Sequence, residues 1–183
     1  MKKINTYLFT VVAGMLLMTA SCTQEPTEAE TKTIDVSEMT TEQKQVIGKK
    51  ISALTQAFFQ NIEKLDIEGC MALFESTPEF LAANLDGTSS DYNSLKKMNG
   101  DAFSQTAGVS LILKKEAVRI LSDSNVLYTF FAEQEITLKT GEKMTFEDMA
   151  GTILFSKING EWKATFYHES ALAPVVGDSE DIL

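Results

Sequence analysis

The sequence is poor in the residues from which metal and catalytic sites are most often built. Its 183 residues include one histidine, His168, and two cysteines, Cys22 and Cys70. Without paired cysteines or a second histidine, the chain has no zinc-binding pattern, and we expect no metal. The glycines form no phosphate-binding loop, and no serine lies in a nucleophile elbow, so we expect no cofactor.

Positive charge is also scarce. Against 26 acidic residues there are only 16 basic ones, of which Arg119 is the single arginine, and the formal net charge is −10. Such a chain repels phosphate backbones, so nucleic acid is not an expected partner. The length and the 44% hydrophobic content fit one globular domain with a leader or tail.

Long apolar runs are absent except at the N-terminus. There, Lys2 and Lys3 precede an apolar stretch over residues 7–18, and three small residues follow at 19–21. This three-part pattern predicts a signal peptide over residues 1–21, because the apolar stretch is short for a membrane-spanning helix.

Cys22 directly follows this predicted leader. Ala20 and Ser21 before it resemble a lipobox, the cleavage motif of bacterial lipoproteins, whereas Thr19 departs from the usual aliphatic residue. The resemblance implies a diacylated Cys22 that anchors the protein in the cell envelope, at the outer membrane and facing either the periplasm or the surface. The alternative is a chance cysteine after an ordinary signal peptide. Residues 22–39 are acidic and lack aromatics, which predicts a disordered tether.

A domain is expected over residues 40–174, beginning with helices. Thr40 and Gln43 have capping-box spacing. They precede apolar residues three or four positions apart, which predict one long amphipathic helix: Ile47, Ile51, Leu54, Phe58, Ile62 and Leu65. Asp66 can cap a short second helix that contains a buried Cys70. A short strand over 79–85 and a short helix over 101–106 follow.

From Val109 the hydrophobic period changes to two, which predicts four long strands joined by turns. A change of parity within the first strand predicts a bulge at residues 114–116. The second strand, from residue 126, has apolar residues at both parities and is expected to be buried on both faces. Asn159-Gly160 predicts a tight hairpin between strands over 144–157 and 161–170. Residues 175–183 are read as an acidic tail.

Helices followed by a highly curved antiparallel sheet make an α+β fold, with the long first helix across the concave face. Three stretches resemble the NTF2-like superfamily, including its SnoaL-like members: the first helix leading into Asp66, the strand from Gly151 to Asn159-Gly160, and the closing run Trp162 to Ser170. The resemblance implies a cone-shaped fold with an interior ligand pocket and homodimerisation through the outer sheet face. The first helix contains no tyrosine, unlike that of the ketosteroid isomerase branch.

His168 is the candidate general acid or base, because only its side chain has an unperturbed pKa near neutrality. Strict alternation along the last strand places it on one face with Trp162, Ala164, Phe166 and Ser170. Three carboxylates are candidate partners: Asp66, Glu133 and Asp148. A carboxylate facing inward would have a raised pKa, but parity does not fix its direction, and a role as a helix cap already explains Asp66.

Aromatic side chains and His168 are the candidate ligand-binding residues: Phe58, Tyr128, Phe130, Trp162, Phe166 and His168. Two functions remain open. One is a non-catalytic exported module that binds a small apolar ligand or a partner protein. The other is a SnoaL-like enzyme of the isomerase, cyclase or hydratase type, in which His168 and an inward carboxylate transfer protons.

Overall fold

The computed structural model of the chain describes residues 35–177. The predicted signal peptide, Cys22 and most of the predicted tether lie outside the described residues. Within residues 35–177 no helix is both long enough and apolar enough to cross a membrane.

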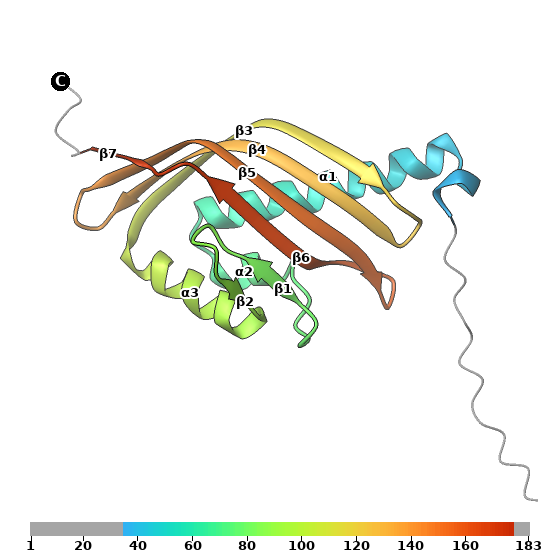
Figure 1. Ribbon diagram of the computed structural model, residues 1–183, viewed down its shortest axis with the longest axis horizontal. Helices are drawn as coiled ribbons and strands as arrows, with labels where there is room; N and C mark the ends of the chain where they lie inside the picture. Colours follow the sequence, from blue (N-terminus) through green and yellow to red (C-terminus); the bar gives the residue numbers. More distant parts are fainter. Residues whose placement is uncertain (1–34, 178–183) are drawn as a thin grey trace, which may run out of the picture. The chain divides into compact units, whose positions relative to one another are not determined.

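Helices, with two short strands among them, precede the long strands of a curved sheet, as expected for the α+β class (Figure 1). The elements, in chain order, are η1 (Val36–Glu38), α1 (Thr41–Glu63), α2 (Ile67–Met71), β1 (Leu81–Ala83), β2 (Ser89–Ser90), α3 (Tyr92–Gln105), β3 (Thr106–Ile120), β4 (Asn125–Leu138), β5 (Lys143–Ile158), β6 (Glu161–Ala171) and β7 (Val175–Gly177).

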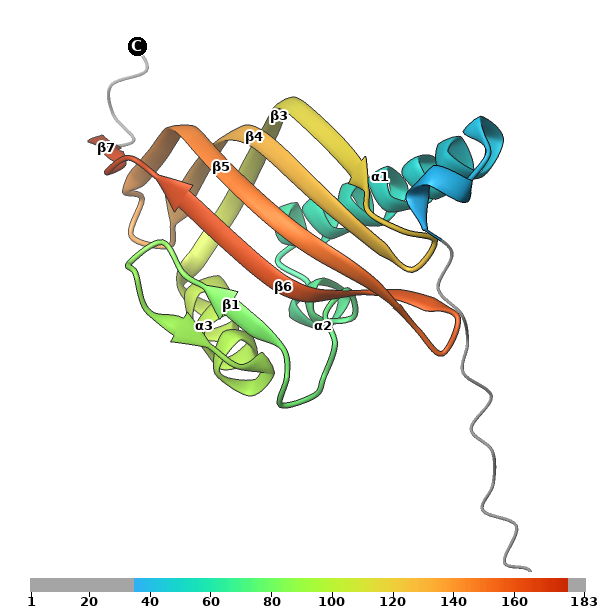
Figure 2. The ribbon, with the colours of Figure 1, turned by 45° about the vertical axis from the view of Figure 1, so that its right-hand side comes forward.

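The sheet has the strand order β2-β1-β6-β5-β4-β3, and β7 pairs with β5. All pairings are antiparallel except that of β1 with β6. Figure 2 shows β3 to β6 as an arch whose concave side holds α1, with α2 and α3 on the same side. The predicted fold class is therefore confirmed.

Local signals account for the ends of α1. Thr40 Oγ1 accepts from the Gln43 N–H at 3.2 Å and Gln43 Oε1 accepts from the Thr40 N–H at 2.8 Å, so the predicted capping box is present. The helix ends where Leu65 takes a left-handed conformation with φ 55°. Its buried face comprises Ile51, Thr55, Phe58 and Phe59.

Two predicted strand features are confirmed. Leu113 pairs with Ala132 and Lys115 with Phe131, which leaves Lys114 as the extra residue of a bulge in β3. The turn between β5 and β6 has positive φ at Asn159 and Gly160, 51° and 85°, as a tight hairpin turn requires.

Other expectations need correction. A helix of 14 residues, α3, replaces the predicted short helix at 101–106, because Asp91 caps it and Leu95 anchors it in the core. The second long strand, β4, is buried on one face only; on its other face Phe131 is 43% exposed. Residues just outside the predicted domain of 40–174 also contact it, since Met39 is buried and β7 pairs with Lys143–Thr145 of β5.

The core lies between α1 and the concave face of the sheet. Phe130 of β4 is fully buried there, and its ring packs on Phe59 of α1 at 5.0 Å between centroids. The ring also covers Gly151 of β5, its partner across the sheet: a Cβ at Gly151 would lie 2.2 Å from the ring. Glycine is therefore the residue that lets the ring approach the strand so closely at this point.

Candidate functional site

A one-residue bulge in β6 decides which side chains enter the interior. Leu154 pairs with Phe166 and Phe155 with Ala164, so Thr165 is the extra residue of this bulge. Ala164 and Tyr167 are consequently both buried on the inner face. The prediction that His168 shares a face with Trp162 and Ala164 is wrong, because the bulge reverses the parity of every residue after Thr165.

The inner face of β6 ends in a cavity of about 330 Å³. Its walls come from α1, α2, the β1–β2 turn, α3 and strands β4 to β6. Most lining side chains are apolar, and six carry amide, carboxylate or hydroxyl groups: Asn84, Asp86, Asn99, Gln134, Tyr167 and Glu169. A mainly apolar cavity of this size with a few polar groups is typical of small-molecule sites.

Tyr167 and Glu169 form the polar centre of this cavity. The Tyr167 hydroxyl donates a hydrogen bond to Glu169 Oε1, and no other hydrogen bond to this carboxylate occurs within residues 35–177. Burial raises the pKa of Glu169, while the bond from Tyr167 acts in the opposite direction. Burial and the neighbouring Glu169 carboxylate together raise the pKa of Tyr167 well above its ordinary value.

Rings surround the Tyr167 side chain on two sides. Its centroid lies 6.1 Å from that of Phe58 and 5.5 Å from that of Phe74, both in edge-on geometry. Phe58 and Phe74 contact each other in the same manner at 5.5 Å. The Tyr167 hydroxyl is thus fixed by its packed ring, and with it the position of the Glu169 carboxylate.

Cys70 also lines the cavity, from α2. Its burial, with the nearby Asp66 charge as a smaller cause, raises the pKa of the thiol to about 12. A thiol with this pKa stays protonated near neutrality and is a poor nucleophile. The structure therefore agrees with Cys70 as a small buried apolar residue.

Asp86 lies in the turn between β1 and β2, on another wall of the same cavity. Its Oδ1 accepts from the Thr88 N–H at 2.9 Å and from the Thr88 hydroxyl at 2.6 Å. These bonds lower the pKa of Asp86, which is exposed. Asp86 is therefore ionised at neutral pH, and its carboxylate is hydrogen-bonded within its own turn. The Glu169 carboxylate is less exposed and accepts one hydrogen bond, from Tyr167.

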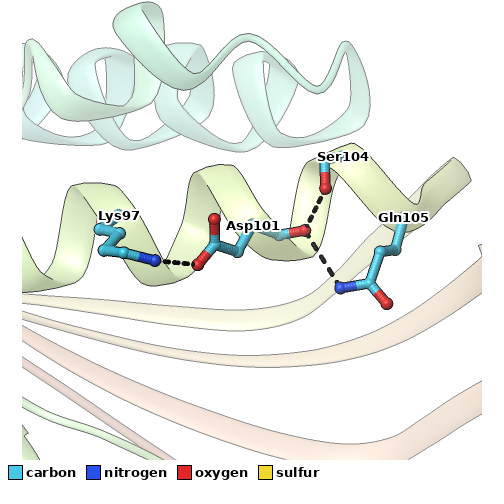
Figure 3. Close-up of polar contacts among 4 residues, drawn as sticks. All are labelled: Lys97, Asp101, Ser104 and Gln105. Carbon is cyan, nitrogen blue, oxygen red and sulfur yellow. Dashed lines mark hydrogen bonds and ion pairs between the residues drawn. The ribbon is translucent and has the colours of Figure 1, made fainter.

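The wall formed by α3 is reinforced on its solvent side. The Asp101 carbonyl oxygen accepts from Ser104 Oγ at 2.6 Å and Gln105 Nε2 at 3.4 Å, and its carboxylate pairs with Lys97 Nζ at 2.6 Å (Figure 3). These contacts hold the last turns of α3, which carry Ala102 and Phe103 at the cavity.

The six predicted ligand-binding residues lie in four different places. Phe58 lines the cavity. Tyr128 and Phe130 are fully buried in the core and do not line the cavity, and the Tyr128 hydroxyl donates to Glu116 Oε2 at 2.6 Å. Trp162 borders a separate hollow of about 410 Å³ between α1, α2 and the β5–β6 turn.

Phe166 and His168 face outward from β6. His168 lies beside Thr152 of β5 and Ala83 of β1 in the sheet. The roles that the sequence suggested for them in ligand binding and proton transfer stay predictions, but their side chains do not enter the cavity.

The three candidate carboxylates are likewise engaged elsewhere. Asp66 caps α2 by accepting from the Gly69 N–H at 3.0 Å. Glu133 and Asp148 each lie 3.5 Å from Lys114 Nζ at the β3 bulge, with side chains 38% and 79% exposed. Within residues 35–177, no group of three or more potential ligands gathers where it could hold a metal ion.

Known proteins with this fold include enzymes. The model of the SnoaL-like domain family matches residues 51–174, while no curated protein matches the chain significantly in sequence. A protein from Novosphingobium aromaticivorans proposed to be a scytalone dehydratase superposes with a TM-score of 0.67 at 12% identity, over 76% of this chain and 91% of the other.

Two further structures are similar at equally low identity. An NTF2-like superfamily protein from Salmonella enterica has a TM-score of 0.64 at 16% identity, over 71% of this chain and 94% of its own. The type 3 LinA hexachlorocyclohexane dehydrochlorinase from Novosphingobium barchaimii has a TM-score of 0.64 at 9% identity, over 75% and 94%. The fold is therefore NTF2-like, and the chain belongs to the SnoaL-like domain family.

Proposed function

We propose that this protein is an exported module, anchored by lipid on Cys22, that holds a small and mainly apolar molecule inside its cone. The cavity of about 330 Å³ is the observation that carries the proposal. Its volume is within the range of small-molecule sites, and its aromatic walls come from separate elements that pack on one another.

The proposal is tested by closing the cavity. Ala102 lies on the α3 wall and is exposed, so Ala102→Trp places an indole at the cavity without removing a core side chain. Ala53→Trp is the matched control, because Ala53 is an exposed helical alanine of α1 that lines none of the hollows described above. Native mass spectrometry of the purified proteins should find a bound small molecule in wild type and Ala53→Trp, and little in Ala102→Trp.

Proton transfer within the same cavity is a second candidate function. It is favoured by the Tyr167–Glu169 pair and by the enzymes among the structures of this fold. In this arrangement the acid or base would be Glu169, since His168 faces the opposite side of β6. A reaction that is lost in Glu169→Gln and kept in His168→Ala would support this assignment, and the reverse pattern would support His168.

Attachment and assembly complete the proposal. Lipid on Cys22 would be the membrane anchor of the domain in the cell envelope.

The outer sheet face would mediate homodimerisation, because Leu127, Leu154 and Phe166 are adjacent there across β4, β5 and β6. Light scattering of the soluble domain should show a dimer that Leu154→Asp converts to a monomer; a monomeric wild type would leave this face to a partner protein or to solvent.

A further inference from the structure

The charges around the cavity are of one sign. The lining residues that can carry charge are Cys70, Asp86, Tyr167 and Glu169, and none of the lining residues is a lysine, arginine or histidine. α1, α3, β4 and β5 contribute only uncharged side chains to the walls. An anionic ligand would therefore be desolvated next to two carboxylates without a compensating cation, which is strongly unfavourable.

The aromatic walls add a second preference. Phe58, Phe74 and Tyr167 contact one another with centroid distances of 5.5–6.1 Å, and all three line the same cavity as Glu169. Aromatic rings attract cations within about 6 Å of their centroids, and most strongly where water is excluded. A carboxylate beside such rings is a typical environment for an organic ammonium group.

We propose that the cavity selects a hydrophobic amine, whose ammonium group pairs with Glu169 while its apolar body packs on the aromatic walls. This inference rests on the proposed function, because it names the ligand class of the same cavity. Tyr167 is a positioning residue here: its hydroxyl occupies Oε1 of Glu169 and leaves Oε2 for the ligand. An ammonium group would replace the solvation that Glu169 loses on burial; among the described residues only the Tyr167 hydroxyl replaces part of it.

A neutral ligand with a carbonyl group is the competing occupant, since a protonated Glu169 could donate a hydrogen bond to it. The two differ in how binding depends on pH. An amine needs ionised Glu169, so its affinity should rise with pH through the raised pKa of Glu169. A carbonyl ligand needs protonated Glu169, so its affinity should fall over the same range. Asp86, the other carboxylate, is already ionised there, and the pKa values of Cys70 and Tyr167 lie far above it.

The test uses three probes with one skeleton: 2-phenylethylamine, 2-phenylethanol and phenylacetate. Isothermal titration of the soluble domain should show the amine binding about tenfold tighter than the alcohol, as a charge-assisted contact predicts, and phenylacetate not binding. The amine affinity should increase from pH 5 to pH 8. The amine itself stays protonated over this range, as a lysine side chain with its pKa of about 10.4 does.

Glu169→Gln should reduce the amine affinity to that of the alcohol and remove its pH dependence. Glu147→Gln is the matched control, because Glu147 is exposed on β5 and does not line the cavity. Equal affinities for amine and alcohol, unchanged in Glu169→Gln, would overturn the amine inference while leaving the cavity as a binding site. If none of the three probes bound wild type, the proposed function would fail with it.

Discussion

Gly151→Ala tests the packing that underlies the cavity wall. Gly151 is paired with both Phe130 and Glu169 across the sheet, and the Phe130 ring occupies the space where a Cβ would stand. The added methyl group would lie 2.2 Å from two ring atoms, whereas ordinary van der Waals contacts are 3.4–4 Å. To reach an ordinary contact distance, either the Phe130 ring or strand β5 has to move by about 1 Å, which a close-packed core resists.

The ring has little room to move. Phe130 is fully buried and packs on Phe59 at 5.0 Å and Tyr128 at 6.3 Å between centroids. Overpacking of this kind destabilises by about 1–3 kcal/mol, and we expect the upper end here because the methyl group meets a ring held on both sides. A loss of about 3 kcal/mol corresponds to a fall in Tm of about 6–12 °C for a chain of this size.

Circular dichroism melting and urea titration would measure the effect, with Gly48→Ala as control. Gly48 lies in α1 with nothing within 4 Å of an added Cβ, so alanine there should stabilise by about 0.5–1 kcal/mol. Phe130→Leu should cost about 1–2 kcal/mol alone but relieve the clash, so the double variant should be less destabilised than the sum of both. A Gly151→Ala protein that melts within about 2 °C of wild type, or strict additivity, would refute the close packing of ring on strand.

Three further predictions concern other parts of the chain. Because burial raises the pKa of Glu169, the unfolded state ionises first as pH rises, and wild type should lose stability between the ordinary glutamate pKa and the raised one; Glu169→Gln should remove this slope in urea titrations at a series of pH values. Thr40→Ala removes one half of the capping box and should lower the free energy of unfolding by about 1 kcal/mol, measured in the same way. Cys22→Ser should release the protein from the membrane fraction of expressing cells, and unchanged sedimentation with membranes would contradict the lipid anchor.

The sequence predicted the fold class because its signals were local and strong. The capping box at Thr40, the three-and-four spacing of α1 and Asn159-Gly160 each specify backbone geometry within a few residues. The bulge at Lys114 was also predictable, since the apolar parity changes around it. The first part of α3 was missed because it is mostly polar and Leu95 is its only buried residue.

The site was not predictable in the same way. Phe166 and Tyr167 are adjacent aromatic residues, so the sequence is compatible with either one facing inward. The bulge at Thr165 resolves this choice through the pairing of β6 with β5, a long-range contact that local pattern does not encode. Because of the extra residue, Thr165, the Glu169 side chain lines the cavity and the His168 side chain lies on the opposite face of β6.

Two tyrosine hydroxyls in this fold donate to glutamate carboxylates, and the two glutamates differ in exposure and in their number of hydrogen-bond donors. Tyr128 donates to Glu116, whose carboxylate is exposed and also accepts from Ser52 at 3.1 Å, so this pair is complete without a ligand. Glu169 is set in an apolar wall with a single donor, and burial raises its pKa instead of an ion pair lowering it. A carboxylate in that position destabilises the folded protein near neutral pH, and glutamine or leucine would serve the fold better. A ligand with a complementary group would, on binding, restore the stability that the buried carboxylate costs the fold.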